Sequence, residues 1–438
     1  MPFSSALLTD RYELTMLDAA LTSGTHERAS LFEVFARGLP EGRRYGVVAG
    51  TGRLLELIQE FRFGDAELTW LRDQDFLSNR AIDLLASYRF SGDIRGYREG
   101  ELYFPDSPIL EVEAPFWEGV LLETLILSVL NFDSAIAGAA SRMVTAAQGR
   151  PVSEMGSRRA HERAAVAAAR AAWIAGFSAT SNLEAGRTWG LPTMGTAAHA
   201  FTLLHDSEED AFRAQVASFG PDTTLLIDTY EIEAAVATAV RVAGPGLGAV
   251  RIDSGDLTVV AADVRRHLDA LGATRTQITV TNDLNEYSIA ALAAAPVDTY
   301  GVGTALVTGS GAPTAGMVYK LVARHDSAGE WESVAKTSVG KANIGGRKHA
   351  FRRISAGGTA IEEIVAVEGT HPERAPGSGL RDRPLTVPLV RTGVVDAAMT
   401  GHRGTALARE HHARAMEELP LDGFRLGRGE PAIPTRHR

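Results

Sequence analysis

Arginine, aspartate and histidine side chains recur in this sequence where apolar runs end. Arg251 and Asp253 follow one run, Asp228 follows the run before it, and Asp283 follows the run after it. Arg251 and Asp253 are two residues apart, so on a β-strand they share a face. Carboxylates on neighbouring strand ends repel one another unless a cation intervenes, and a hydrated Mg²⁺ on a polyphosphate suits that place. The structural alternative for Asp283, and equally for Asp256, is to cap the following helix.

One histidine lies within this series. His199 ends the segment 195–199, Gly-Thr-Ala-Ala-His. A neutral imidazole held by a carboxylate such as Asp228 can attack phosphorus as a nucleophile, although a lone histidine is more often a structural residue.

Two adjacent arginines follow another apolar run. Arg158 and Arg159 end the segment 154–159, Glu-Met-Gly-Ser-Arg-Arg, and their planar guanidinium groups match phosphate or carboxylate oxygens. The alternative is that both are solvated residues in the first turn of an Ala-rich helix over 160–175. The residues alone leave both readings open.

Glycine-rich segments offer backbone donors for phosphate. The segment 301–304, Gly-Val-Gly-Thr, and the segment 308–311 leave N–H groups unobstructed by Cβ atoms. Taken alone, such glycines more often form a plain tight turn, but late strands of α/β barrels are the usual place for a phosphate site, and this position favours phosphate binding. A basic stretch is typical of a solvated face, but the glycines within it suggest a phosphate-facing loop: Lys336, Lys341, Arg347, Lys348 and Arg352, with Gly340, Gly345 and Gly346.

These polar clusters need elements that bring strand ends together. The runs before them are β-rich, the stretches after them are Ala-rich and helical, and their spacing is roughly 20–30 residues, as in strand–loop–helix units. An α/β barrel places such strand ends on one rim. We therefore predict an irregular, TIM-like α/β barrel over residues 115–315 whose clusters share one active site. The seven clusters are 154–159, 180–182, 195–199, 228–230, 251–256, 282–285 and 301–304.

The remaining sequence predicts a mixed α/β domain over residues 1–114. The segment 316–438 is expected to return to this domain through a hairpin around 326–329, and to end in a loosely held tail from about residue 420. Helices are predicted at 7–22, capped by Thr9 or Asp10, at 50–61 and at 65–87, and strands at 93–97 and 109–112.

Composition narrows the class of protein. The 438 residues carry a formal charge of −10, which argues against a general nucleic-acid or anionic-membrane surface. There are no cysteines and no signal-peptide pattern, so we expect a cytoplasmic protein. Charges such as Glu118, Glu123 and Arg170 interrupt the longest apolar stretches, so none is expected to span a membrane.

Taken in order, these segments resemble the nicotinate phosphoribosyltransferase family from Leu8 to about Arg352. Any one match is modest, but the ordered set is specific. The resemblance implies transfer of a phosphoribosyl group from phosphoribosyl pyrophosphate to nicotinate, coupled to ATP hydrolysis and dependent on Mg²⁺. It also implies a homodimer whose active sites use both subunits. The matching segments are 9–16, Thr-Asp-Arg-Tyr-Glu-Leu-Thr-Met, then 154–159, 180–182, 195–199, 250–256 and 301–304.

The resemblance also implies roles for individual residues. His199 is similar to the histidine that ATP phosphorylates, and Arg251 and Asp253 to the pair that grips the ribosyl and pyrophosphate groups. Two departures are the methionine at 155, where relatives often carry an aromatic residue, and Ala179 in place of the usual glycine. The remaining implied contacts are Tyr12 of a neighbouring subunit on one face of the pyridine ring, Met155 on the other, Arg158 on phosphate or carboxylate, and Gly303 with Thr304 on the 5′-phosphate.

Three other functions compete with this one. Nicotinamide phosphoribosyltransferases resemble this chain but carry an aspartate where it has Ser181, and a carboxylate there would repel nicotinate. Quinolinate phosphoribosyltransferases are shorter and need several cations for two carboxylates. A non-catalytic nucleotide-binding or scaffolding protein would keep the glycines but has no reason to keep His199 together with Arg251, Asp253 and Asp283.

Overall fold

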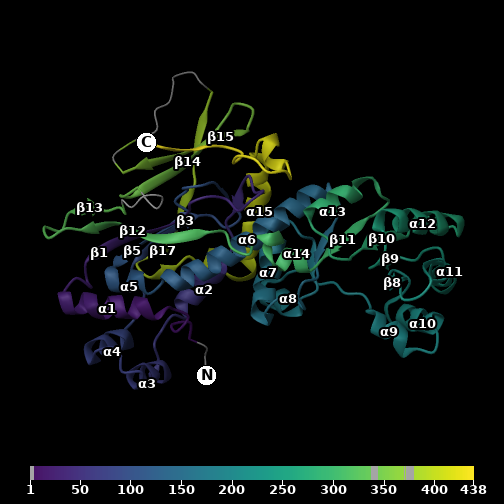
Figure 1. Ribbon diagram of the computed structural model, residues 1–438, viewed down its shortest axis with the longest axis horizontal. Coiled ribbons are helices and arrows are strands. Elements are labelled where there is room, and N and C mark those ends of the chain that lie inside the picture. Colours follow the sequence, from purple (N-terminus) through teal and green to yellow (C-terminus); the bar gives the residue numbers. More distant parts are fainter. Residues whose placement is uncertain (1–3, 337–343, 369, 371–378) are drawn as a thin grey trace. The chain divides into compact units, whose positions relative to one another are not determined.

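The computed structural model describes residues 4–336, 344–368, 370 and 379–438, so Gly340 and Lys341 of the basic stretch lie outside the described residues. The chain forms two compact units, Met1–Gly138 with Thr314–Arg438, and Ala139–Pro313 (Figure 1). The division falls inside helix α6 (Glu123–Ala147) and not near residue 114. The first half of α6 belongs to the first unit because Ile126 and Val129 lie in the core of that unit.

The first unit is built on an antiparallel seven-stranded sheet to which both ends of the chain contribute. Strand β1 (Ala29–Ala36) pairs with β5 (Leu110–Pro115) on one side and with β12 (Met317–His325) on the other. The segment after residue 316 thus pairs with a strand from the N-terminal part of the chain. The sheet order is β13-β12-β1-β5-β3-β17-β18, with β3 Asp93–Tyr97, β13 Trp331–Ser333, β17 Thr386–Arg391 and β18 Val394–Val395.

The helices of this unit largely match the sequence pattern. The helix predicted over 65–87 is interrupted, because Ser78 starts a new helix, accepting the N–H of Ala81, while it donates to Asp18. Glycine at position 24 ends the first helix in the left-handed conformation. The helices are α1 (Arg11–Ser23), α2 (Thr51–Gln59), α3 (Asp65–Asp73), α4 (Asn79–Ala86), α5 (Phe116–Val120) and α15 (Gly401–Glu417).

A second sheet in this unit corrects two predictions. Lys348 and Arg352 alternate on the buried face of β14 (Lys348–Ile354), where Lys348 Nζ lies 2.7 Å from Glu33 and Arg352 lies 2.9 Å from Glu363. They are therefore neither a solvated face nor a phosphate loop. The tail is not loose either, because β19 (Thr435–His437) pairs with the edge of β15 (Ala360–Val367). The sheet order is β16-β14-β15-β19, with β16 Arg381–Pro384, and β2 (Gly46–Val47) pairs separately with β4 (Leu102–Tyr103).

The second unit alternates strands and helices around a parallel sheet, which confirms the irregular α/β barrel. Its strand order is β7-β6-β11-β10-β9-β8, and a parallel bridge from Thr180 to Thr193 continues it beyond β7. The strands are β6 (Val152–Glu154), β7 (Ala179–Thr180), β8 (Thr224–Leu226), β9 (Ala249–Ile252), β10 (Gln277–Val280) and β11 (Thr299–Val302). The helices are α7 (Glu162–Ile174), α8 (Leu183–Trp189), α9 (His199–Leu204), α10 (Glu208–Phe219), α11 (Ile232–Ala243), α12 (Leu257–Ala270), α13 (Glu286–Ala291) and α14 (Thr304–Val307).

One helical segment is more apolar than the sequence analysis expected. Within Phe116–Ala147, an 18-residue window reaches a mean hydropathy of 1.7, so by length and composition this helix could cross a membrane. Residues of the protein itself bury 67% of that window. Such burial is typical of a core helix.

Candidate active site

The register of the parallel sheet brings the predicted aspartates of two neighbouring strands together. Arg251 on β9 is paired with Leu226 on β8, so Asp228 and Asp253 follow in one layer of the rim. The N–H of Asp253 donates to Asp228 Oδ2 at 2.8 Å. On the other side, the hydroxyl of Thr281 donates to Asp253 Oδ1. The two carboxylates are thus held at fixed positions by groups of three adjacent strand ends.

Arg251 is held beneath this layer. Its Nη1 donates to Thr196 Oγ1 at 2.5 Å and to the carbonyl oxygen of Ala197 at 3.2 Å. Burial lowers the pKa of this guanidinium; the negative charges of Asp253 and Asp228 oppose that shift, and the positive charge of Arg158 adds to it. Arg251 Nε and Asp228 Oδ1 are both buried without a hydrogen-bond partner. Unpaired buried polar atoms of opposite sign are what a polar, charged ligand would satisfy.

His199 faces Asp253 from the first turn of α9. Its Nδ1 lies 3.1 Å from Thr229 Oγ1, and its Nε2 lies 3.9 Å from Asp253 Oδ2. The sequence suggested a carboxylate such as Asp228 as the partner of this ring. The carboxylate that faces the ring is Asp253, and Thr229 contacts Nδ1. The side chain is 41% exposed, which leaves the ring accessible to a ligand.

The ends of β6, β7 and β11 form the other side of the barrel rim. Glu154 is fully buried, accepts hydrogen bonds from the N–H of Gly156 and the hydroxyl of Thr180, and has its pKa raised by burial. The half-buried Ser181 is held by its backbone N–H, which donates to the carbonyl oxygen of Glu154 at 2.8 Å. Among the described residues, the Ser181 hydroxyl makes no hydrogen bond. Ser181 therefore has a hydroxyl to offer a ligand.

Met155 lies where a glycine makes room for it. A Cβ added to Gly301 would come within 2.7 Å of the Met155 sulfur. The backbone N–H of Met155 donates to the carbonyl oxygen of Val302 at 2.8 Å. The Met155 thioether thus occupies the space next to Gly301 of β11.

The two arginines of this cluster precede the next helix. His161 caps α7, which begins at Glu162, so Arg158 and Arg159 are exposed loop residues and not first-turn helical residues. The alternative is therefore right that both side chains are exposed to solvent, but wrong in placing them in the first turn of the helix.

The aspartates outside the central pair differ in their roles. Asp256 caps α12 by accepting the N–H groups of Thr258 and Val259, so its structural alternative is correct. Asn285 caps α13, so Asp283 is not a cap. Asp283 has a positive φ of 45° and an exposed carboxylate. Within the described ranges, no group of three or more His, Asp or Glu side chains is arranged to hold a metal ion directly.

The two glycine segments also differ. Gly303 precedes α14, and Thr304 is the exposed first residue of that helix, so their N–H groups lie at a helix start, where intrahelical acceptors are missing. In the segment 308–311, the hydroxyl of Ser310 donates to the buried Glu286, which also pairs with Arg142. The second segment is therefore tied into the barrel framework.

Tyr12 belongs to the first unit, whereas the other candidates belong to the second. It is on α1 and is 44% exposed. Burial, followed by the negative charge of Glu123, raises the pKa of its hydroxyl well above the usual range. The phenol is therefore neutral at any physiological pH.

Sequence reasoning missed the residues that hold the candidates in place. Thr196, Thr229 and Thr281 were not singled out, although each lies within or beside a polar cluster. Glu154 was included in the cluster 154–159, but no role was assigned to its side chain. The available signal was a threonine within or directly before a polar cluster, but the direction of its hydroxyl depends on strand register.

The chain is similar to known proteins over almost its whole length. The family model described as nicotinate phosphoribosyltransferase N-terminal domain matches residues 7–131. A nicotinate phosphoribosyltransferase of Mycobacterium tuberculosis is 58% identical over 442 aligned residues, covering 99% of this chain and 95% of the relative. That of Bacillus subtilis is 38% identical, covering 80% of this chain and 74% of the relative.

Solved structures share the fold. The crystal structure of human nicotinic acid phosphoribosyltransferase superposes with a TM-score of 0.83 at 24% identity, covering 98% of this chain and 97% of the human one. The alignment to the Mycobacterium protein runs through both units at an identity that unrelated chains of this length do not reach. This chain belongs to the nicotinate phosphoribosyltransferase family.

Proposed function

We propose that this protein joins nicotinate to phosphoribosyl pyrophosphate, giving nicotinate mononucleotide and pyrophosphate for NAD salvage. The observation that carries the proposal is the rim cluster of Arg251, Asp228, Asp253 and His199, which contains an unpaired buried donor and an unpaired buried acceptor. This cluster stands in a chain 58% identical to a protein named for that activity.

The chemistry follows from the charges in the cluster. The pyridine nitrogen attacks the ribose C1 carbon while pyrophosphate leaves, through a cation-like ribosyl centre. Arg251 and Arg158 stabilise the charge that accumulates on the leaving group, and Asp228 and Asp253 stabilise the ribosyl centre. No general base is needed, because the pyridine nitrogen already carries a free lone pair. The loop of Gly303 and Thr304 receives the 5′-phosphate.

Mg²⁺ fits this cluster through its carboxylates. Asp228 Oδ1 is buried without a partner, and carboxylate oxygen is a ligand that Mg²⁺ prefers. We assign Asp253, with Asp283 directly or through water, to hold the ion, with Asp228 beside them. When bound, Mg²⁺ neutralises phosphate charge. The aspartates themselves keep the ribosyl end of the substrate oriented above Arg251.

ATP is the proposed co-substrate, with His199 as the group that accepts its γ-phosphate. Thr229 fixes the ring through Nδ1, which leaves Nε2 directed toward Asp253 and available as the nucleophile. Hydrolysis of the resulting phosphohistidine would favour nucleotide synthesis.

Substrate choice is tested at Ser181. Ser181→Asp should raise the KM for nicotinate at least tenfold, about 1.4 kcal/mol or more, because it places like charge beside the ring carboxylate. Steady-state pyrophosphate release with nicotinate and with nicotinamide measures this. Ser181→Ala is the matched control, since it removes the hydroxyl without adding charge.

Three results would count against this assignment. Unchanged nicotinate kinetics in Ser181→Asp would show that Ser181 does not face the ring. Faster release with nicotinamide than with nicotinate in the wild-type protein would favour the nicotinamide enzyme. No release with either substrate would favour a non-catalytic nucleotide-binding protein.

We propose a homodimer in which Tyr12 serves the active site of the other subunit. Tyr12 is exposed on the first unit, whereas the rim cluster is in the second. Mixing Tyr12→Ala with Arg251→Ala chains should restore activity, because each mixed dimer keeps one intact site of its two. Random exchange of equal amounts predicts about a quarter of wild-type activity.

The readout needs demonstrated subunit exchange, for instance by mass spectrometry of differently tagged chains. Mixing Arg251→Ala with Asp253→Asn chains is the control, because both changes lie in the same unit and no intact site can form. Absence of recovery despite exchange would mean that Tyr12 serves its own subunit or no site.

A further inference from the structure

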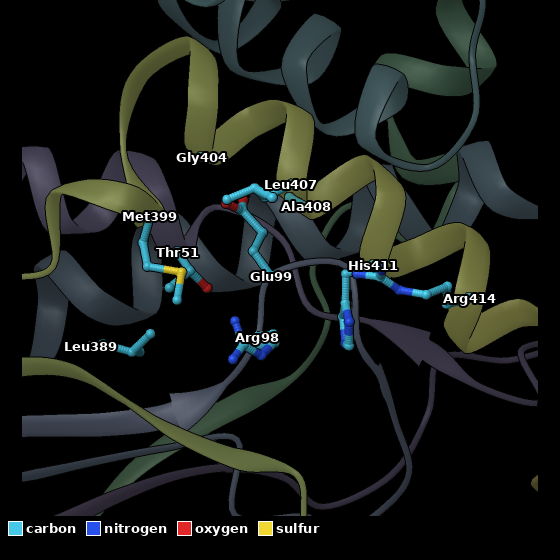
Figure 2. A pocket seen from close by; sticks show the side chains of 10 residues that line it. All are labelled: Thr51, Arg98, Glu99, Leu389, Met399, Gly404, Leu407, Ala408, His411 and Arg414. Atoms are coloured by element: carbon cyan, nitrogen blue, oxygen red, sulfur yellow. The ribbon is translucent and has the colours of Figure 1, made fainter.

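A cavity in the first unit is lined by none of the residues assigned to the reaction. Its volume is about 370 Å³. Its walls are α15, the start of α2 and the backbone that follows β3, as Figure 2 shows. This volume lies within the range of small-molecule sites, roughly 300–1,000 Å³.

Two arginines line this cavity without a protein partner. Arg98 follows β3 and Arg414 is on α15, and neither guanidinium has a hydrogen bond or ion pair with any residue that the structure describes. The nearby Arg383 differs, because it forms ion pairs with Glu101 at 2.7 Å and Glu418 at 2.6 Å. Arg383 is thus paired, whereas the exposed Arg98 and Arg414 line the cavity with their guanidinium groups available to a ligand.

The carboxylate in the cavity wall is already engaged. Glu99 is 7% exposed, and its two oxygens accept the N–H groups of Gly50 at 2.6 Å and Gly52 at 3.0 Å. These donors belong to the N-terminus of α2, where a negative charge is stabilised. The Glu99 carboxylate therefore accepts the free N–H groups at the start of α2 and does not neutralise the charges of Arg98 and Arg414.

A histidine adds a polar edge. His411 Nε2 lies 2.8 Å from the buried Glu101 Oε2, which fixes the ring in the wall. In Figure 2, Arg98 and His411 lie on the same side of the cavity, below Glu99 and helix α15. The two arginines thus come from two separate segments of the chain.

Apolar side chains complete the wall. Leu389, Met399 and Leu407 line it beside the arginines. Gly404 keeps α15 close to this wall, since an added Cβ would clash with the Met399 backbone. Apolar surface with a few convergent charged groups is typical of a site for an organic anion.

We propose that this cavity binds a small organic phosphate. The phosphate group of this ligand contacts the guanidinium groups of Arg98 and Arg414, which suit phosphate oxygens. The organic part of the ligand packs against Leu389, Met399 and Leu407. The proposal does not depend on the reaction assigned to the barrel, because no residue of the rim cluster lines the cavity.

The test is calorimetric titration with AMP, carried out on the full-length Arg251→Ala chain so that binding at the rim cluster is suppressed. One AMP per chain is expected. The added changes Arg98→Gln and Arg414→Gln should weaken AMP binding at least tenfold, and adenosine should bind at least tenfold more weakly than AMP. Arg403→Gln is the matched control, because Arg403 is an exposed arginine of α15 that does not line the cavity.

Three outcomes of the AMP titrations would each overturn the proposal. These are no AMP binding in the Arg251→Ala chain, equal AMP affinity in the Arg98→Gln/Arg414→Gln chain, or equal loss of affinity in the Arg403→Gln control. Circular dichroism of each variant shows whether it is folded. Inorganic phosphate that displaces AMP would support the role of the phosphate group, and failure to displace AMP at saturating phosphate would count against it.

Discussion

Replacing Asp253 with asparagine is expected to lower kcat/KM for phosphoribosyl pyrophosphate at least 100-fold while leaving the fold intact. The amide oxygen of the new side chain could still accept the hydroxyl of Thr281, and the backbone N–H at this position would still donate to Asp228. What is lost is the negative charge, which we assign to Mg²⁺ and to the ribosyl centre. The expected loss is about 2.7 kcal/mol of transition-state stabilisation. Initial rates at varied phosphoribosyl pyrophosphate, together with the melting temperature, measure the two effects separately.

The matched control is Asp256→Asn, since asparagine caps a helix as well as aspartate and Asp256 is an exposed neighbour on the same loop. Its activity should stay within about twofold of wild type. Turnover should also stop in excess chelator and return with added Mg²⁺. Full turnover without divalent cations would show that the reaction does not need Mg²⁺. Equal losses of kcat/KM in both variants would show that the conformation of the loop, and not the charge of Asp253, determines the rate.

The fold was largely predictable because strand–helix alternation has few solutions. Parallel strands joined by helices leave all their carboxyl ends at one edge, so the polar clusters had to share a rim. The tail was not predictable, because residues 435–437 pair with β15, about 70 positions earlier in the chain. Nothing local in an Arg- and Pro-rich segment identifies such a partner.

The candidate site was predictable in its charges but not in its contacts. The i, i+2 spacing of Arg251 and Asp253 placed both on the rim without knowledge of the register. The partner of His199 depended on register, because Asp228 and Thr229 are adjacent in sequence and point in different directions. Similarly, the charges at 348 and 352 could not be distinguished from solvated ones until their partners Glu33 and Glu363 were known.

His199→Asn is expected to abolish covalent labelling by ATP and the stimulation of synthesis by ATP. Incubation of the wild-type protein with γ-labelled ATP should give an acid-labile, base-stable label, as phosphohistidine does. Some ATP-independent synthesis should remain in the variant, because Arg251, Asp228 and Asp253 do not depend on the ring. His267→Asn is the matched control, since His267 is a partly exposed histidine on α12 that faces Glu233.

The structure adds a second variant to this experiment. Thr229→Val removes the hydroxyl 3.1 Å from His199 Nδ1, so the ring loses its orientation but keeps its nucleophile. Labelling should become roughly tenfold slower or more while still reaching the wild-type extent, because a positioning residue affects the rate and not the identity of the modified atom. Label retained in His199→Asn would place the nucleophile elsewhere. No label in the wild-type protein would leave His199 as a residue that orients Asp253, and synthesis would then proceed without a phosphoenzyme.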